Sequence, residues 1–131
     1  MKHPIVYLPI EFRSREFDSK ALLAYVLDSV AEIELDRGDA ASAECRASEA
    51  ASAARVVDHQ SELAVARSIL ARARCARGDP SSAREVVQES ARELDKRPAP
   101  SARALTAFTQ AASLVGFSLG NEHEGRSRWP T

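Results

Sequence analysis

The sequence contains few of the residues that build bulky cores, tight turns or covalent cross-links. Aromatic residues make up 5% of the 131 residues, beside 5 glycines, 6 prolines and 2 cysteines. So few turn-forming residues favour long helices over a many-stranded sheet. The two cysteines have no Cys-x-x-Cys spacing, so we expect free thiols in a reducing, cytoplasmic compartment.

The charge balance and the hydrophobic runs exclude further classes of protein. The formal net charge is −1 at pH 7, whereas domains that hold nucleic acid usually carry a strong positive excess. No apolar run approaches the roughly 18 residues of a membrane span, and the first ten residues lack the apolar run of a secretory leader. We therefore expect no nucleic-acid partner and no membrane partner.

An internal repeat organises the middle of the chain. The triplet Arg-Gly-Asp occurs at 37–39 and again at 77–79, an offset of 40 residues that also pairs the flanking segments 34–50 and 74–90. A weaker third copy, Leu-Gly-Asn, occurs at 119–121. Self-similarity at such a period predicts stacked copies of one supersecondary unit.

Each copy has the residues of a short turn between two helices. Gly38 and Gly78 follow helix-like runs, and glycine takes the left-handed conformation past a helix end without steric cost. Asp39 and Asp79 can then cap the next helix through their side-chain oxygens. Two helices joined so tightly must pack antiparallel.

Apolar residues recur at spacings of three and four, which is the period of amphipathic helices. The pattern predicts an all-α fold of about two and a half antiparallel helix-turn-helix repeats over 19–120. Residues 1–18 are expected to be an extended amino-terminal segment, because 4–10 are strand-like, and residues 121–131 a flexible tail. The five expected helices are 19–37, 40–57, 60–77, 80–96 and 101–118.

The paired-helix unit resembles the tetratricopeptide repeat over about residues 20–120. That family has small residues at fixed helix positions and Gly-Asp or Gly-Asn at the turn. The period of 40 is longer than the family's usual 34, and the family's large aromatic residues are not kept. The matching residues are Ala31, Gly38, Asp39, Ala43 and Ala50 in the first copy, and Ala71, Gly78, Asp79, Ala83 and Ser90 in the second.

The resemblance implies a right-handed helical stack that binds a partner peptide or helix in a concave groove. The first expected helix is acidic and the third is basic. These charges can form ion pairs between helices, or act as two walls that read a peptide's charges, and both interpretations stay open. The partner-binding residues implied by the repeat alignment are Tyr25, Asp28, Glu32, Arg72, Gln110 and Phe117.

A second resemblance is local. Residues 4–27 are similar to the opening strand, loop and helix of a bacterial surface-carbohydrate biosynthesis family that itself resembles glycosyltransferases. The match is carried by Leu-Pro-Ile-Glu at 8–11 and Arg-Glu-Phe-Asp at 15–18, and it stops near residue 28. It implies a remnant or accessory of surface-polysaccharide synthesis.

No phosphate-binding loop, dinucleotide motif or nucleophile elbow is present. The three histidines are far apart in sequence, so we expect no metal, no cofactor and no enzyme activity. The favoured function is a protein-interaction module, for instance a regulatory part of a bacterial signalling or transcription system. The alternatives are the carbohydrate-synthesis role and a self-associating module. The latter would form a homodimer through 101–118, because that expected helix is apolar on more than one side.

Overall fold

The computed structural model describes the backbone of residues 10–97 and 99–116, and the side chains from residue 18 onward. These residues form helices and connections, with no strand among them, so the all-α prediction is confirmed. The helices are α1 (Ile10–Asp36), α2 (Ala40–Val56), α3 (Gln60–Ala76), α4 (Pro80–Asp95) and α5 (Ala102–Val115).

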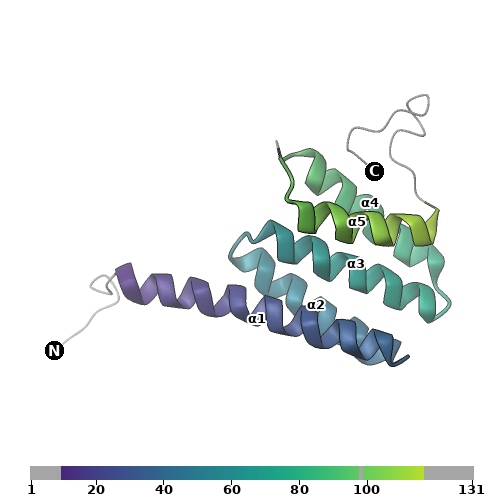
Figure 1. The fold of residues 1–131 in the computed structure, drawn as a ribbon, viewed down its shortest axis with the longest axis horizontal. Coiled ribbons are helices and arrows are strands. Elements are labelled where there is room, and N and C mark those ends of the chain that lie inside the picture. The colour runs from purple at the N-terminus through teal and green to yellow at the C-terminus, as the bar shows by residue number, and fades with distance from the viewer. Residues whose placement is uncertain (1–9, 98, 117–131) are drawn as a thin grey trace.

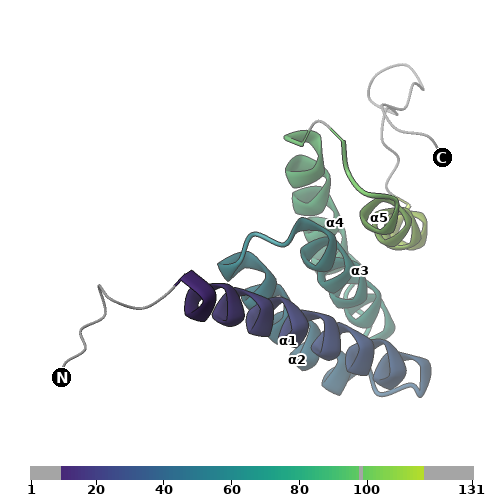
Figure 2. The same cartoon turned by 60° about the vertical axis from the view of Figure 1, so that its left-hand side comes forward.

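The helices form two hairpins, α1–α2 and α3–α4, followed by α5. Helix α3 contacts each of the other four helices, so it is the centre of the fold. Figure 1 shows α1, α3 and α5 in one layer, with α2 and α4 in a second layer behind them. The amino-terminal part of α1 extends past the end of α2 in both views (Figures 1 and 2).

The two predicted hairpin turns are confirmed, and their geometry is the same. Gly38 and Gly78 both have φ +85°, a conformation that other L-residues adopt only at a cost. The Asp39 carboxylate accepts the backbone N–H of Ser42, and the Asp79 carboxylate accepts that of Ser82. Each hairpin therefore ends its first helix and caps its second by one shared mechanism.

The connection between the hairpins uses different residues for the same purpose. Asp58 takes φ +54°, because a short polar side chain tolerates the left-handed region better than most. His59 then caps α3 by accepting the backbone N–H of Glu62 on its Nδ1 atom, at 3.3 Å. This connection is therefore as short as the two glycine turns.

The 40-residue offset extends to α5 and defines which positions are equivalent. The alignment of Gln110 and Phe117 with α3 used an offset of 42, and the structure corrects it to 40. The hydroxyls of Ser61 and Ser101, 40 residues apart, lie 2.6 Å from each other. Buried alanines recur at the same offset in α1, α3 and α5, namely Ala24, Ala64 and Ala104, and Ala31, Ala71 and Ala111.

Two helix ends differ from the prediction. Helix α1 begins at Ile10, so residues 10–18 are helical and the expectation of an extended segment there was wrong. Helix α5 ends at Val115 instead of residue 118, because Gly116 takes the left-handed conformation, φ +72°. Residues 1–9 and the expected tail 121–131 lie outside the described residues.

The core differs in character from one end of the stack to the other. Around α2 the buried residues are almost all alanine, with Leu63 and Ile69 of α3 as the larger members. Between α3, α4 and α5 the core includes Val87, Leu94 and Phe108. In the described part of the chain, no helix combines the length and the apolarity needed to cross a membrane.

Candidate functional site

Five of the six predicted partner-binding residues lie on the layer formed by α1, α3 and α5. Tyr25, Asp28 and Glu32 lie on α1, and Arg72 lies on α3. Gln110 is exposed on α5, and with the corrected offset it is not equivalent to Asp28. Phe117 lies outside the described residues. We call the surface formed by Tyr25, Asp28, Glu32, Glu62, Ser68, Arg72 and Arg103 the α1–α3–α5 face.

Glu32 and Arg72 form a bidentate ion pair between α1 and α3. The two guanidinium NH groups of Arg72 donate to the two carboxylate oxygens at 2.8 and 3.0 Å. These hydrogen bonds outweigh the effect of burial and hold the pKa of Glu32 below its usual range. At this position the acidic and basic walls neutralise each other, as the ion-pair interpretation predicted.

A second group of polar side chains, farther along the same helices, joins three helices. Arg103 of α5 donates to the Glu62 carboxylate of α3 at 3.0 Å, and its guanidinium lies 5.5 Å from the centre of the Tyr25 ring of α1. A guanidinium over an aromatic ring is attracted by the ring's quadrupole. Side chains from the two outer helices thus meet across α3.

Sequence reasoning missed Glu62 and Arg103. Glu62 lies in the first turn of α3, where an acidic residue is ordinary because it stabilises the helix dipole. Arg103 lies in the first turn of α5, two residues after the capping Ser101. Since they are 41 residues apart, the 40-residue repeat was the one available indication that these two residues are neighbours.

Asp28 is a buried carboxyl group beside another carboxyl group. Asp28 is 2% exposed and Glu62 is 5% exposed. No donor among the described residues reaches either Asp28 oxygen, so Asp28 and Glu62 can bond only through a shared proton. Burial, the hydrogen bond with Glu62 and the charge of Glu62 raise the pKa of Asp28 to about 9. The pair therefore holds a proton at neutral pH.

Unpartnered polar atoms gather on this face. Apart from the proton that Asp28 shares with Glu62, the carboxyl oxygens of Asp28, the hydroxyl of Ser68 and the Nε of Arg72 are buried without a hydrogen-bond partner. One further atom of this kind, Oε1 of Glu34, belongs to a residue that pairs with Arg46 of α2. Asp28 and Ser68 are equivalent positions in α1 and α3, 40 residues apart. Buried polar groups in native proteins are nearly always hydrogen-bonded, so these atoms mark the α1–α3–α5 face as the candidate binding site.

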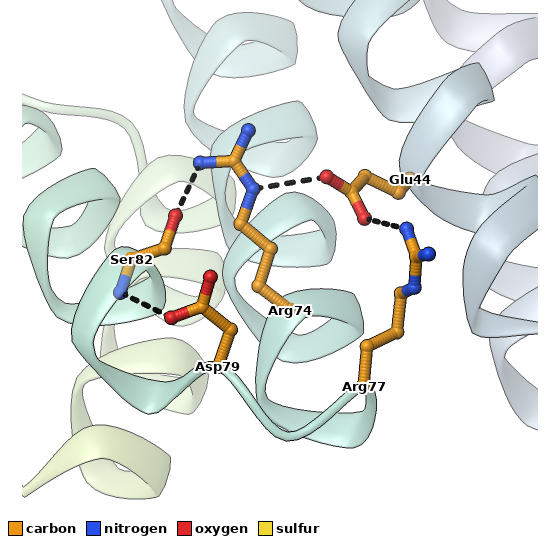
Figure 3. Close-up of a pocket in the computed structure, with 5 residues that line it drawn as sticks. All are labelled: Glu44, Arg74, Arg77, Asp79 and Ser82. Carbon is orange, nitrogen blue, oxygen red and sulfur yellow. Dashed lines mark hydrogen bonds and ion pairs between the residues drawn. The ribbon is translucent and has the colours of Figure 1, made fainter.

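A polar pocket of about 440 Å³ lies at the other side of α3, between α2 and the start of α4 (Figure 3). Glu44 accepts hydrogen bonds from Arg74 at 3.1 Å and from Arg77 at 2.7 Å. Burial raises the pKa of the Glu44 carboxyl, but these hydrogen bonds outweigh that effect and hold it below its usual range. Arg74 also donates to Ser82 at 2.9 Å. With Asp79 capping α4, the charges balance, and the pocket's role is to join the hairpins.

Histidine and cysteine side chains are the usual sites of metal and thiol chemistry. No group of three His, Cys, Asp or Glu side chains there could hold a metal ion. His59 caps α3, while His3 and His123 lie outside the described residues. Cys45 and Cys75 are free thiols, the first exposed and the second half-buried.

The chain was also compared with known proteins. It matches no known protein family, no curated protein and no solved structure.

Proposed function

We propose that the chain is a protein-interaction module that binds a peptide or helix of a partner protein on the α1–α3–α5 face. The resemblance to the tetratricopeptide repeat supports this proposal, because that family binds peptides on its layer of first helices. The role is recognition, without catalysis or a cofactor. Within this proposal, the chain would serve as a regulatory part of a bacterial signalling or transcription system.

One observation carries the proposal. Buried polar atoms of Ser68 and Arg72, and of Asp28 apart from the proton it shares with Glu62, lack a partner within the described chain and belong to the α1–α3–α5 face. Leaving such a group unpaired costs about 1–3 kcal/mol, so a ligand that supplies the missing hydrogen bonds gains affinity there. A peptide backbone and its polar side chains carry both donors and acceptors, as these atoms require.

The test is a selection of random 15-residue peptides against the immobilised chain. Two variants provide the control: Arg72→Glu, which breaks the ion pair with Glu32, and the double variant Glu32→Arg with Arg72→Glu, which keeps an ion pair but reverses its direction. We expect one enriched peptide motif that binds the wild type and binds the double variant at least tenfold more weakly. The double variant should keep the thermal midpoint of the wild type.

Two outcomes would contradict the proposal. One is a selection that enriches no motif. The other is a motif whose affinity for the double variant equals that for the wild type, because binding would then lie away from this face.

Self-association is a second candidate function, and one observation favours it. Leu22, Val26 and Ile33 form an apolar stripe on α1 and are 62%, 45% and 51% exposed, whereas terminal repeats usually present a polar outer face. The stripe replaces α5 as the best-supported dimer surface. Helix α5 buries most of its apolar residues within the chain and exposes Leu114, at 55%, as its one large apolar side chain among the described residues.

Sedimentation velocity separates the two dimer surfaces. If α1 mediates a dimer, Leu22→Ser with Val26→Ser yields a monomer, and Leu114→Ser leaves the dimer intact. The reverse result would restore the predicted interface through residues 101–118, and a monomeric wild type would remove this candidate.

A further inference from the structure

The Asp28–Glu62 pair has fewer hydrogen-bond donors than its carboxyl groups can accept. Arg103 donates to Glu62 at 3.0 and 3.2 Å. Beyond the proton shared with Glu62, no group among the described residues bonds to either oxygen of Asp28. The carboxyl pair is almost fully buried, whereas Tyr25 and the Arg103 side chain are 48% and 47% exposed. These two half-exposed groups are therefore the ones that can move to admit a ligand.

We propose that the Asp28–Glu62 pair receives a cationic side chain, an arginine or a lysine, from the partner peptide, and that Arg103 holds its place in the free chain. This inference rests on the proposed function and names the chemistry that the α1–α3–α5 face selects. The contacts of Arg103 show that a guanidinium fits against Glu62 and the Tyr25 ring.

An organic cation suits this site better than a metal ion. Within the described residues no third His, Cys, Asp or Glu completes a metal site here. An arginine side chain instead presents several donors in a fork that matches two carboxylate oxygens. The Tyr25 ring adds a cation–π surface that a hydrated metal ion does not use as effectively.

Binding of a cation releases the proton that the pair holds. Asp28 faces Glu32 on its own helix, Glu62 of α3 and Arg103 of α5. With its pKa raised to about 9, Asp28 is protonated at pH 7. A cation that donates to both carboxylates favours the doubly ionised pair, and the proton passes to the solvent. Affinity therefore rises with pH, by up to about tenfold per pH unit below pH 9.

The probe is the tripeptide acetyl-Ala-Arg-Ala-amide, titrated into the isotope-labelled full chain and followed by NMR. Its control carries citrulline in place of arginine, which keeps the shape and removes the charge. We expect shifts of the Tyr25, Asp28 and Glu62 signals with the arginine tripeptide and none with the citrulline tripeptide. Between pH 6 and pH 8 the affinity should increase at least tenfold.

Two variants sharpen the experiment. Arg103→Gln removes the internal competitor and should tighten the tripeptide's binding at least fivefold. Asp28→Asn keeps the shape of the protonated side chain, and should weaken binding at least fivefold and abolish its dependence on pH. Because Asp28→Asn removes a buried ionisable group, the variant stays folded.

The outcomes distinguish this inference from the proposed function. Weaker binding by Arg103→Gln, an affinity independent of pH, or no shift at Asp28 and Glu62 would each overturn the cation site. A peptide motif selected on the wild type that lacks arginine and lysine would do so too, while leaving the interaction module itself in place.

Discussion

The two hairpins share one backbone plan and fill it with side chains of different size. Both turn at a glycine with φ +85° and both cap the second helix with an aspartate. Yet every buried residue of α2 is an alanine, whereas α4 buries Val86, Val87 and Leu94 beside its small residues. The same glycine and aspartate therefore form the turn whether the core behind it consists of small or of large side chains.

The difference shows that large side chains fill the core at the carboxyl-terminal end of the stack and small ones at the amino-terminal end. Distances between packed helices depend on the side chains at the contact, so the alanines of α2 permit a close approach to α1 and α3. At the other end, Phe108 of α5 occupies the position equivalent to Asp28 and Ser68, and it is 4% exposed. One position thus carries a charge-bearing, a polar and an aromatic residue along the stack.

The largest expected loss of stability comes from a cavity in the core between α3, α4 and α5. Phe108→Ala should lower the free energy of unfolding by about 3–5 kcal/mol, because a buried aromatic ring is lost and its surroundings relax only in part. Leu63→Ala, in the alanine-rich core, is the matched truncation and should cost less, about 2–3 kcal/mol. Urea unfolding measures both, and an equal or reversed order would contradict the contrast between the two cores.

Replacing a buried alanine by a larger residue also tests the contrast between the two cores. Ala43 and Ala83 are equivalent and both are 0% exposed, so leucine at either position should destabilise the chain by about 1–3 kcal/mol. We expect Ala43→Leu to cost more, since three of the other four buried residues in its cluster are alanines, which cannot change rotamer. Thermal unfolding of the two variants is the measurement, and an unmoved midpoint for Ala83→Leu would contradict the repeat alignment.

Asp28 in the first hairpin titrates, whereas the equivalent Ser68 in the second does not. The two positions should therefore differ in how they make the stability of the chain depend on pH. In the folded chain the pKa of Asp28 is raised from 3.8 to about 9, so the folded state retains a proton that the unfolded chain has lost. Its stabilising contribution is fully present below about pH 4 and declines as the pH rises through 9. Asp28→Asn should therefore stabilise the chain at pH 7 by about 1–2 kcal/mol and flatten the dependence of stability on pH.

Ser68→Ala is the matched control for this prediction. Its buried hydroxyl has no partner, so the variant should stabilise the chain by about 1–3 kcal/mol. Because a hydroxyl does not titrate, the pH dependence should stay that of the wild type. Carboxyl NMR of the wild type provides the independent check. A pKa of Asp28 near 4 would remove the explanation.

The smallest effect tests what the hairpins share. A side chain on Gly38 or Gly78 would meet no atom within 4 Å, so Gly38→Ala and Gly78→Ala measure the cost of the left-handed conformation alone. We expect about 1–2 kcal/mol from each. Urea unfolding gives the free energy of unfolding of each variant. Equal losses would confirm that the two turns are equivalent, and a difference above about 1 kcal/mol would show that they are not.

The sequence was sufficient to predict the parts of the fold that depend on local chemistry. The bounds of α2, α3 and α4 agree with the predicted ranges to within one residue, because Gly38, Gly78 and the capping aspartates act within a few residues of themselves. The start of α1 was not predictable in this way. The β-branched and aromatic residues before Ile10 favour strand by propensity, and that bias was carried into a segment that is helical.

The candidate site was predicted in part. The alignment identified Tyr25, Asp28, Glu32 and Arg72 as members of one layer, because equivalent helices in a repeat lie side by side. It could not show that Asp28 lies against Glu62 or that Arg103 reaches Tyr25, since those contacts depend on the depth of each side chain. The register of α5 was predicted two residues out, because Gly120 was taken for the third turn glycine.

The spacing of the contacts has a consequence for how the chain folds. Most contacts of the described helices lie within a helix or between helices that follow each other in the chain, and proteins rich in such local contacts fold fast. The contact between Tyr25 and Arg103 differs, because it joins the first helix to the last. Stacking of Arg103 on this ring would therefore follow the appearance of helix. The fluorescence of Tyr25, measured in a variant in which Tyr7 and Trp129 are replaced, reports this final step of assembly.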